Sequence, residues 1–99
     1  MKDQLIEYLK TADLSRAKAY YIAEQFGMSY STFKRRLGET EFHDLVIAER
    51  KRRVLEGIHQ GKRGWDLTNL AGYSERQTFY RAFASWFGVP YSRYVERVQ

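Results

Sequence analysis

An internal repeat constrains the fold of this chain more strongly than any other feature. The segments IAEQFGMS (22–29) and LTNLAGYS (67–74) follow one pattern: an apolar residue, a small residue, three variable positions, a glycine, an apolar or aromatic residue and a serine. Glycine adopts the left-handed conformation that a sharp exit from a helix needs, so each copy predicts a helix followed by a tight turn. An aromatic residue follows each turn, Phe33 in one copy and Phe79 in the other, and predicts a second helix there.

The whole sequence predicts an all-α fold. It contains one proline, at position 90, and no run of alternating β-branched residues that would indicate a strand. We expect about seven helices. The second begins between 15 and 18 and ends at 26, and the others lie near 5–9, 31–37, 42–60, 67–71, 74–87 and 91–97. The segment 38–40 is expected to break the helical pattern. The candidate N-caps are Ser15 and, for the third helix, Ser29 or Ser31, and Ser74 is expected to start the sixth helix.

Apolar residues recur at helical spacing and predict the buried faces. Phe33 and Leu37 face inward on the second helix of the first copy. The corresponding stripe in the second copy is Phe79, Phe83, Trp86 and Phe87. The stripe on the long helix is Ile47, Val54 and Ile58, with Ala48 and Leu55 beside them. This spacing is typical of helix packing, so we interpret the aromatic residues as core and not as a platform for stacking bases.

These elements form two helix-turn-helix units joined by a long helix. We place the first unit at 1–41, the linker helix at 42–60 and the second unit at 61–99. A linker of about 19 residues spans roughly 28 Å. Helix-turn-helix units insert their second helix into the major groove of DNA, and two such units about one helical turn (~34 Å) apart would dock in successive grooves.

The distribution of charge favours a polyanionic partner. Residues 1–30 carry four basic and four acidic side chains, whereas residues 31–99 carry thirteen basic and eight acidic ones, so the net charge of +5 lies entirely in the later part. The chain has no cysteine, which excludes disulfides and thiolate metal sites. No apolar run approaches the ~18 residues of a membrane span. We expect a cytoplasmic protein that associates with the nucleoid when bound to DNA and needs no cofactor.

No constellation of catalytic or metal-binding residues stands out in the sequence. His43 and His59 have no partner at the spacing of metal ligands. The chain shows no Ser-His-Asp arrangement, no paired carboxylates and no glycine-rich phosphate loop. We therefore expect neither a metal site nor an enzyme.

The chain resembles the DNA-binding domain of AraC/XylS-type transcription regulators, in which one long helix joins two helix-turn-helix units. IAEQFGMSYSTFKRRL (22–37) resembles the family's first unit, and GYSERQTFYRAFASWFGV (72–89) resembles its more characteristic second unit. Phe42 and Arg50 match the start of the family's linker helix. The join between Leu37 and Phe42 is shorter than in the family.

The resemblance implies which side chains contact base edges. The matching positions are Ser31, Lys34, Arg35, Arg76, Gln77 and Arg81. Arginine and lysine donate to guanine, and glutamine pairs with adenine. The outward positions of the first recognition helix extend to Glu39. The candidate phosphate contacts are Ser29, Tyr30, Arg36, Lys62, Arg63, Ser74 and Thr78, and several of them lie beside turns or helix starts. The alternative interpretation is that these residues only form solvated helix faces.

A second basic run, from Arg50 to Arg53, lies on the linker helix. Consecutive helical residues point around the axis, so the four side chains do not all face one partner. We expect Arg50 at a buried edge, paired with an acid such as Glu24 or Asp44, and the other three in solvent. Direct contact of one of them with a phosphate is the less favoured alternative.

The sequence thus predicts a sequence-specific regulator of transcription that binds double-stranded DNA. The resemblance implies a monomer on a non-palindromic site and activation through contact with RNA polymerase, and repression by blocking a promoter is equally compatible with the sequence. The alternative is a degenerate family member that acts as a protein-interaction module on another regulator. The short join at 38–41 suggests it, as do Thr68, which stands where the family usually has alanine, and Gly64, which stands where it usually has an aliphatic residue. The chain is either a stand-alone regulator or the DNA-binding part of a longer one.

Overall fold

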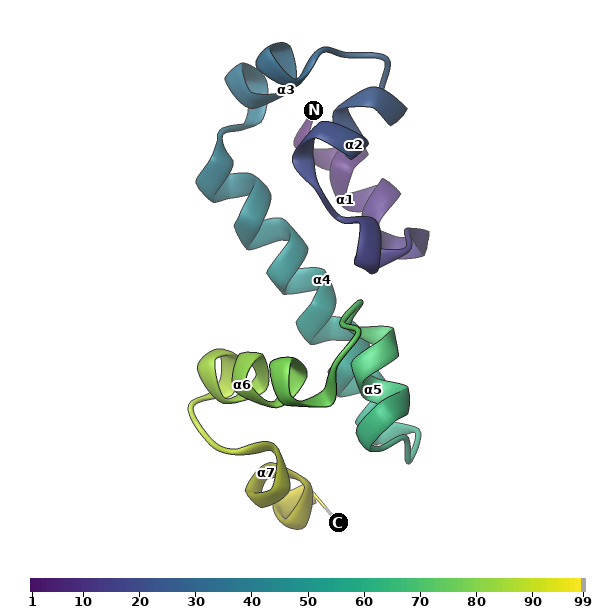
Figure 1. Ribbon diagram of the computed structural model, residues 1–99, viewed down its shortest axis with the longest axis vertical. Helices are drawn as coiled ribbons and strands as arrows, with labels where there is room; N and C mark the ends of the chain where they lie inside the picture. Colours follow the sequence, from purple (N-terminus) through teal and green to yellow (C-terminus); the bar gives the residue numbers. More distant parts are fainter. Residues whose placement is uncertain (99) are drawn as a thin grey trace. The chain divides into compact units, whose positions relative to one another are not determined.

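The computed structural model describes residues 1–98, which form seven α-helices and one 3-10 turn and contain no strand (Figure 1). The elements are α1 (Lys2–Thr11), η1 (Leu14–Arg16), α2 (Ala19–Gln25), α3 (Tyr30–Leu37), α4 (Glu39–His59), α5 (Gly64–Leu70), α6 (Arg76–Phe87) and α7 (Tyr91–Val98). The prediction of an all-α fold with about seven helices is confirmed. The chain divides into two compact units, residues 1–50 and residues 51 onward, and α4 contributes to both.

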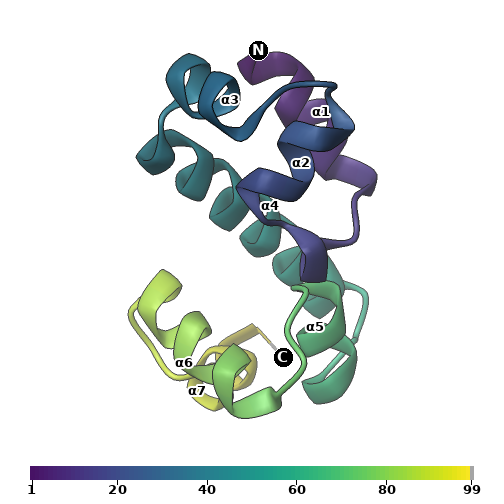
Figure 2. The same cartoon turned by 45° about the horizontal axis from the view of Figure 1, so that its top comes forward.

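The first unit has its own apolar core. Its buried residues are Leu5, Leu9, Leu14, Ile22, Ala23, Phe33, Leu37 and Val46. Figure 2 shows α1, α2 and α3 gathered about the N-terminal half of α4. Helices α2 and α3 pack directly against each other. Ala23, the small residue of the first repeat, is completely buried.

The two predicted turns have the same backbone hydrogen bonds. After α2, the N–H of Met28 donates to the carbonyl of Ala23 at 3.0 Å, and Gly27 lies at a φ of 68°. After α5, the N–H of Tyr73 donates to the carbonyl of Thr68 at 3.0 Å, and Gly72 lies at a φ of 88°. This bonding satisfies helix carbonyls that would otherwise lack partners and requires a left-handed residue, which glycine supplies. The repeat in the sequence is therefore a repeat in the structure.

Two helix starts in the first unit differ from the prediction. Helix α2 begins at Ala19 with Lys18 as its N-cap, so the prediction of Ser15 as the cap is wrong. Ser15 lies in η1, before the cap position Lys18, and its hydroxyl donates to Asp13 at 2.6 Å. Helix α4 begins at Glu39 instead of position 42, because Gly38, at a φ of 82°, separates α3 from α4 by a single residue.

The buried residues of α4 differ from the predicted stripe. Val54 and Ile58 are buried as expected, but the buried position in the first half is Val46. Ile47 is only half-buried, and both Ala48 and Leu55 are exposed. The prediction assumed one continuous stripe, whereas α4 supplies one core with Val46 and a different core with Val54 and Ile58.

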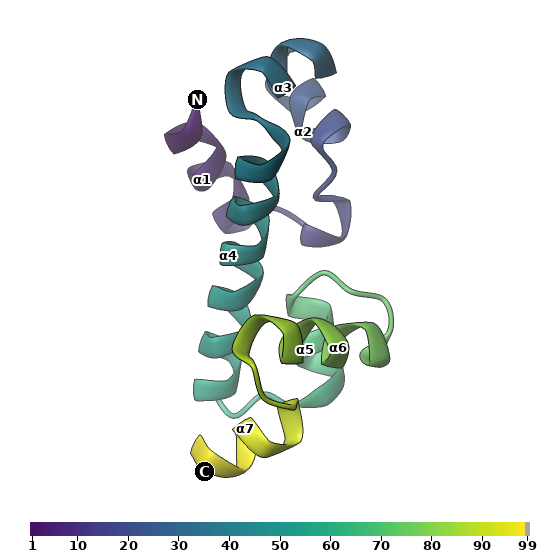
Figure 3. The same cartoon turned by 90° about the vertical axis from the view of Figure 1, so that its left-hand side faces the viewer.

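The second unit is built around aromatic residues. Its buried residues are Val54, Ile58, Leu67, Ala71, Phe79 and Phe83. Figure 3 shows α5, α6 and α7 grouped around the last turns of α4. Trp86 and Phe87 are half-buried at the edge of this core. Thr68 is completely buried, and its hydroxyl donates to the carbonyl of Gly64 at 2.9 Å, so the polar group of this residue is satisfied inside its own helix.

The start of α6 also differs from the prediction. The helix begins at Arg76 with Glu75 as its N-cap, so the prediction that Ser74 starts it is wrong by two residues. The Glu75 side chain makes no capping hydrogen bond. Among residues 1–98, no helix combines the length and the apolarity needed to cross a membrane.

Candidate nucleic-acid interface

Helix α3 presents a polar, cationic face because its apolar residues are all used in the core. Phe33 and Leu37 are 1% and 6% exposed. The residues on the remaining sides are exposed, and they are Tyr30, Ser31, Lys34, Arg35 and Arg36. Ser29 is the N-cap, and its hydroxyl oxygen accepts from the N–H of Thr32 at 3.2 Å. The three cations lie in the last turn, where the helix dipole favours positive charge.

One of these cations already has a partner. The ammonium of Lys34 lies 2.9 Å from a carboxylate oxygen of Glu39, and the Tyr30 hydroxyl donates to the same oxygen at 3.3 Å. The hydrogen bond and charge of Lys34 lower the pKa of the Glu39 carboxyl, with a further contribution from Tyr30, and the carboxylate in turn raises the pKa of Lys34. This ion pair was not predicted from the sequence. Its signal was the short join, which brings an acid next to the cations.

Helix α6 presents a similar face in the second unit. Phe79 and Phe83 are completely buried and fix the orientation of the helix within its unit. The predicted base contacts Arg76, Gln77 and Arg81 are all exposed. Thr78, a predicted phosphate contact, is half-buried.

The N-caps show which positions of the two helices correspond. Counted from the caps Ser29 and Glu75, Phe33 corresponds to Phe79, and both are buried. By the same count, two pairs of predicted base contacts become equivalent: Ser31 with Gln77, and Arg35 with Arg81. Within each helix the two residues are four positions apart and share one face. The caps are one residue further apart than the turn glycines, which is why the repeat in the sequence does not align the helices by itself.

The predicted phosphate contacts before and after α5 lie in different settings. Lys62 is exposed in the loop that precedes the helix. The Arg63 guanidinium donates to the carbonyl of Lys62 at 2.7 Å and to that of Ile58 at 3.4 Å, so it closes the end of α4. Ser74 is exposed in the turn before Glu75, outside α6.

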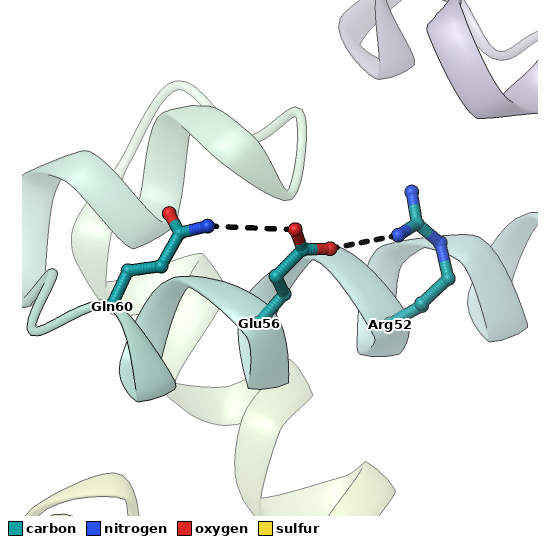
Figure 4. Close-up of polar contacts among 3 residues, drawn as sticks. All are labelled: Arg52, Glu56 and Gln60. Atoms are coloured by element: carbon teal, nitrogen blue, oxygen red, sulfur yellow. Dashed lines mark hydrogen bonds and ion pairs between the residues drawn. The ribbon is translucent and has the colours of Figure 1, made fainter.

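The basic run on α4 is largely engaged within the protein. The Arg50 guanidinium donates to the carbonyl of Leu14 at 3.2 Å. Lys51 lies over the ring of Phe87, 5.4 Å from its centroid. Figure 4 shows Arg52 reaching Glu56 at 2.9 Å. The amide of Gln60 donates to the other carboxylate oxygen of Glu56 at 3.4 Å (Figure 4). These contacts make the run a weaker candidate for phosphate binding than the exposed faces of α3 and α6.

Among residues 1–98, no three His, Cys, Asp or Glu side chains gather closely enough to hold a metal ion. Comparison of the chain with protein-family models, with curated proteins and with solved structures found no match. The candidate surfaces for contact with nucleic acid are two, the exposed face of α3 in the first unit and the exposed face of α6 in the second, and their interpretation depends on their side chains.

Proposed function

We propose that this protein is a sequence-specific regulator of transcription that binds double-stranded DNA through α3 and α6. The observation that carries the proposal is the equivalence of the two units. Each consists of a helix, a glycine turn with the same hydrogen bonds, and a second helix, and the second helices expose Ser31 and Arg35 in one unit and Gln77 and Arg81 in the other. This is the arrangement that helix-turn-helix proteins use to read the major groove.

The proposal extends to the class of regulator. We call the exposed residues Ser31 and Arg35 on α3, and Gln77 and Arg81 on α6, the reading faces. Because the two faces differ, they favour a monomer on a non-palindromic site. The resemblance to AraC/XylS-type regulators favours activation through contact with RNA polymerase. The exposed side chains of α3 and α6 are mostly hydrogen-bond donors, which supports a role in contacting DNA bases and phosphates.

Binding to labelled duplex of random sequence, measured at 50 and 200 mM salt, tests this function. If about 6 phosphates are neutralised, affinity should fall on the order of 10³-fold between the two salt concentrations. Selection of bound duplexes from a random pool then gives the preferred site. A protein that binds no duplex at either salt concentration, or one whose binding does not depend on salt, contradicts the proposal.

A second function is favoured by one contact. Lys34 is a predicted base contact, yet it is paired with Glu39. Such a pair is expected if the exposed face of α3 no longer binds DNA. The rival proposal is a module that binds another regulator. A folded protein that fails to bind any duplex in the titration above supports it.

A further inference from the structure

Lys34 is exposed on α3, the first proposed DNA-binding helix, and its partner Glu39 begins α4, the next helix. Tyr30 joins this pair, with its ring 5.9 Å from the Lys34 ammonium and its hydroxyl on Glu39. The three side chains line a small cavity of about 40 Å³ whose walls include Phe33 and Phe42. Phe33 belongs to the core, so one wall of this cavity is held in place by the packing of the first unit.

The position of Glu39 follows from the short join. A single residue, Gly38, separates α3 from α4, and Glu39 is therefore the first residue of the long helix. An acidic side chain in the first turn is favoured by the helix dipole. The same join places its carboxylate within ion-pair distance of Lys34, which is in the last turn of α3.

This pair is weak enough for DNA to open. The side chains of Lys34 and Glu39 are 51% and 64% exposed, and ion pairs this exposed contribute little to stability. A phosphate or a guanine edge can therefore replace the carboxylate as the partner of Lys34. The carboxylate then remains beside the duplex, where it is repelled by phosphates and accepts hydrogen bonds only from base donors, such as the amino group of cytosine.

We propose that Glu39 is a specificity-determining residue, which competes with DNA for Lys34 and thereby weakens binding to non-cognate duplex more than binding to the preferred site. The proposal rests on the proposed function. A duplex that satisfies both Lys34 and the released carboxylate loses little by opening the pair. A duplex that satisfies only Lys34 leaves a negative charge facing phosphates.

Glu39→Gln tests this competition, with Glu41→Gln as the matched control. Glu41 lies in the same first turn, has the same charge and is paired with Lys2 at 3.5 Å. The affinity of each variant is measured on random duplex and on the selected site. Glu39→Gln should tighten binding to random duplex by up to about fivefold, the factor that an exposed ion pair can supply, and should tighten the selected site less. Glu41→Gln should change the two affinities equally.

A third variant shows that the effect passes through Lys34. In a Lys34→Ala background, Glu39→Gln should lose most of its effect on random duplex, because the competed cation is absent. Equal effects of Glu39→Gln and Glu41→Gln would overturn the proposal, since only net charge would then matter. Failure of the wild-type protein to bind any duplex would instead contradict the proposed function, so the two failures are distinguishable.

Discussion

The guanidinium of Arg50 donates a hydrogen bond to the backbone carbonyl of Leu14, at 3.2 Å. Leu14 belongs to the short turn η1 that connects α1 to α2, and its side chain is buried in the core of the first unit. The bond therefore fixes the connection between two helices against the side of α4. Sequence reasoning placed Arg50 at a buried edge but named only acidic side chains as partners. The structure adds a backbone acceptor.

Replacing Arg50 by alanine should destabilise the first unit. A hydrogen bond to a charged group contributes roughly 1.5–3 kcal/mol, and the half-buried side chain also loses packing. The matched control is Arg52→Ala in the same basic run, where an exposed pair with Glu56 contributes about 0–1 kcal/mol. Urea unfolding of both variants measures the difference. Equal losses would mean that the bond to Leu14 contributes nothing.

Some features of the fold could be predicted because they depend on local chemistry. The turns at Gly27 and Gly72 require a residue in the left-handed conformation, and a glycine in the sequence indicates where such a residue is found. The inward positions of Phe33 and Phe79 follow from helical spacing. The cap at Ser29 was one of two candidates, and the structure selects it because its hydroxyl reaches the N–H of Thr32.

Other features depend on how helices meet, which spacing does not show. The burial of Val46 in place of Ile47 reflects two cores that share α4. The contact of Lys34 with Glu39 depends on the geometry of a one-residue join. The hydrogen bond from Arg63 to the carbonyl of Ile58, near the end of α4, depends on the course of the loop between α4 and α5. Each involves groups that only the tertiary structure brings together, so the sequence predicted which helix carries the candidate site but not which of its charges are already paired.

Gly57 marks a close approach of α4 to α5, and replacing it by alanine should destabilise the second unit. A Cβ atom there would lie 2.7 Å from Cδ2 of Leu67 and 2.9 Å from Cδ1 of Leu70. Leu67 is completely buried and cannot move aside freely. Overpacking of about 1–3 kcal/mol should outweigh the gain of roughly 1 kcal/mol that alanine normally gives in a helix.

The measurement for Gly57→Ala is thermal or urea unfolding, with a double-mutant cycle as the control. Leu70 is half-buried at the edge of the core, so Leu70→Ala removes one of the two colliding groups. In the Gly57→Ala background, Leu70→Ala should therefore cost less than it does alone. A stabilised Gly57→Ala variant would show that the two leucines reorient without loss.

Phe83 should matter more for stability than its neighbour Trp86. Phe83 is completely buried, and its ring lies 4.6 Å from that of Phe87 and 5.3 Å from that of Tyr94, measured between centroids. Trp86 is half-buried, and the centroids of its nearest rings, those of Tyr73 and Phe87, are each 6.2 Å away. Phe83→Ala should cost roughly 3–5 kcal/mol, and Trp86→Ala clearly less. Melting temperatures of the two variants decide the order, and a reversed order would be inconsistent with the burial of these rings.

Arg81 and Arg36 should contact DNA in different ways. Arg81 is exposed on α6 at the position equivalent to Arg35, and it shares a face with Gln77. Arg36 is exposed on α3 next to the buried Leu37, which places it to one side of the face that carries Ser31 and Arg35. We therefore expect Arg81 to read a base and Arg36 to contact phosphate.

Site selection and salt titration on Arg81→Ala and Arg36→Ala test this difference. Loss of a base contact should cost about 1–3 kcal/mol on the preferred site and relax the preference at one base pair. Loss of a phosphate contact should weaken binding to all sequences about equally and reduce the salt slope by about one unit. Arg81→Ala should thus flatten one column of the selected-site profile, while Arg36→Ala leaves the profile unchanged. The opposite result would mean that the helices enter the groove with a different rotation from the one that burial of Phe33 and Phe79 indicates.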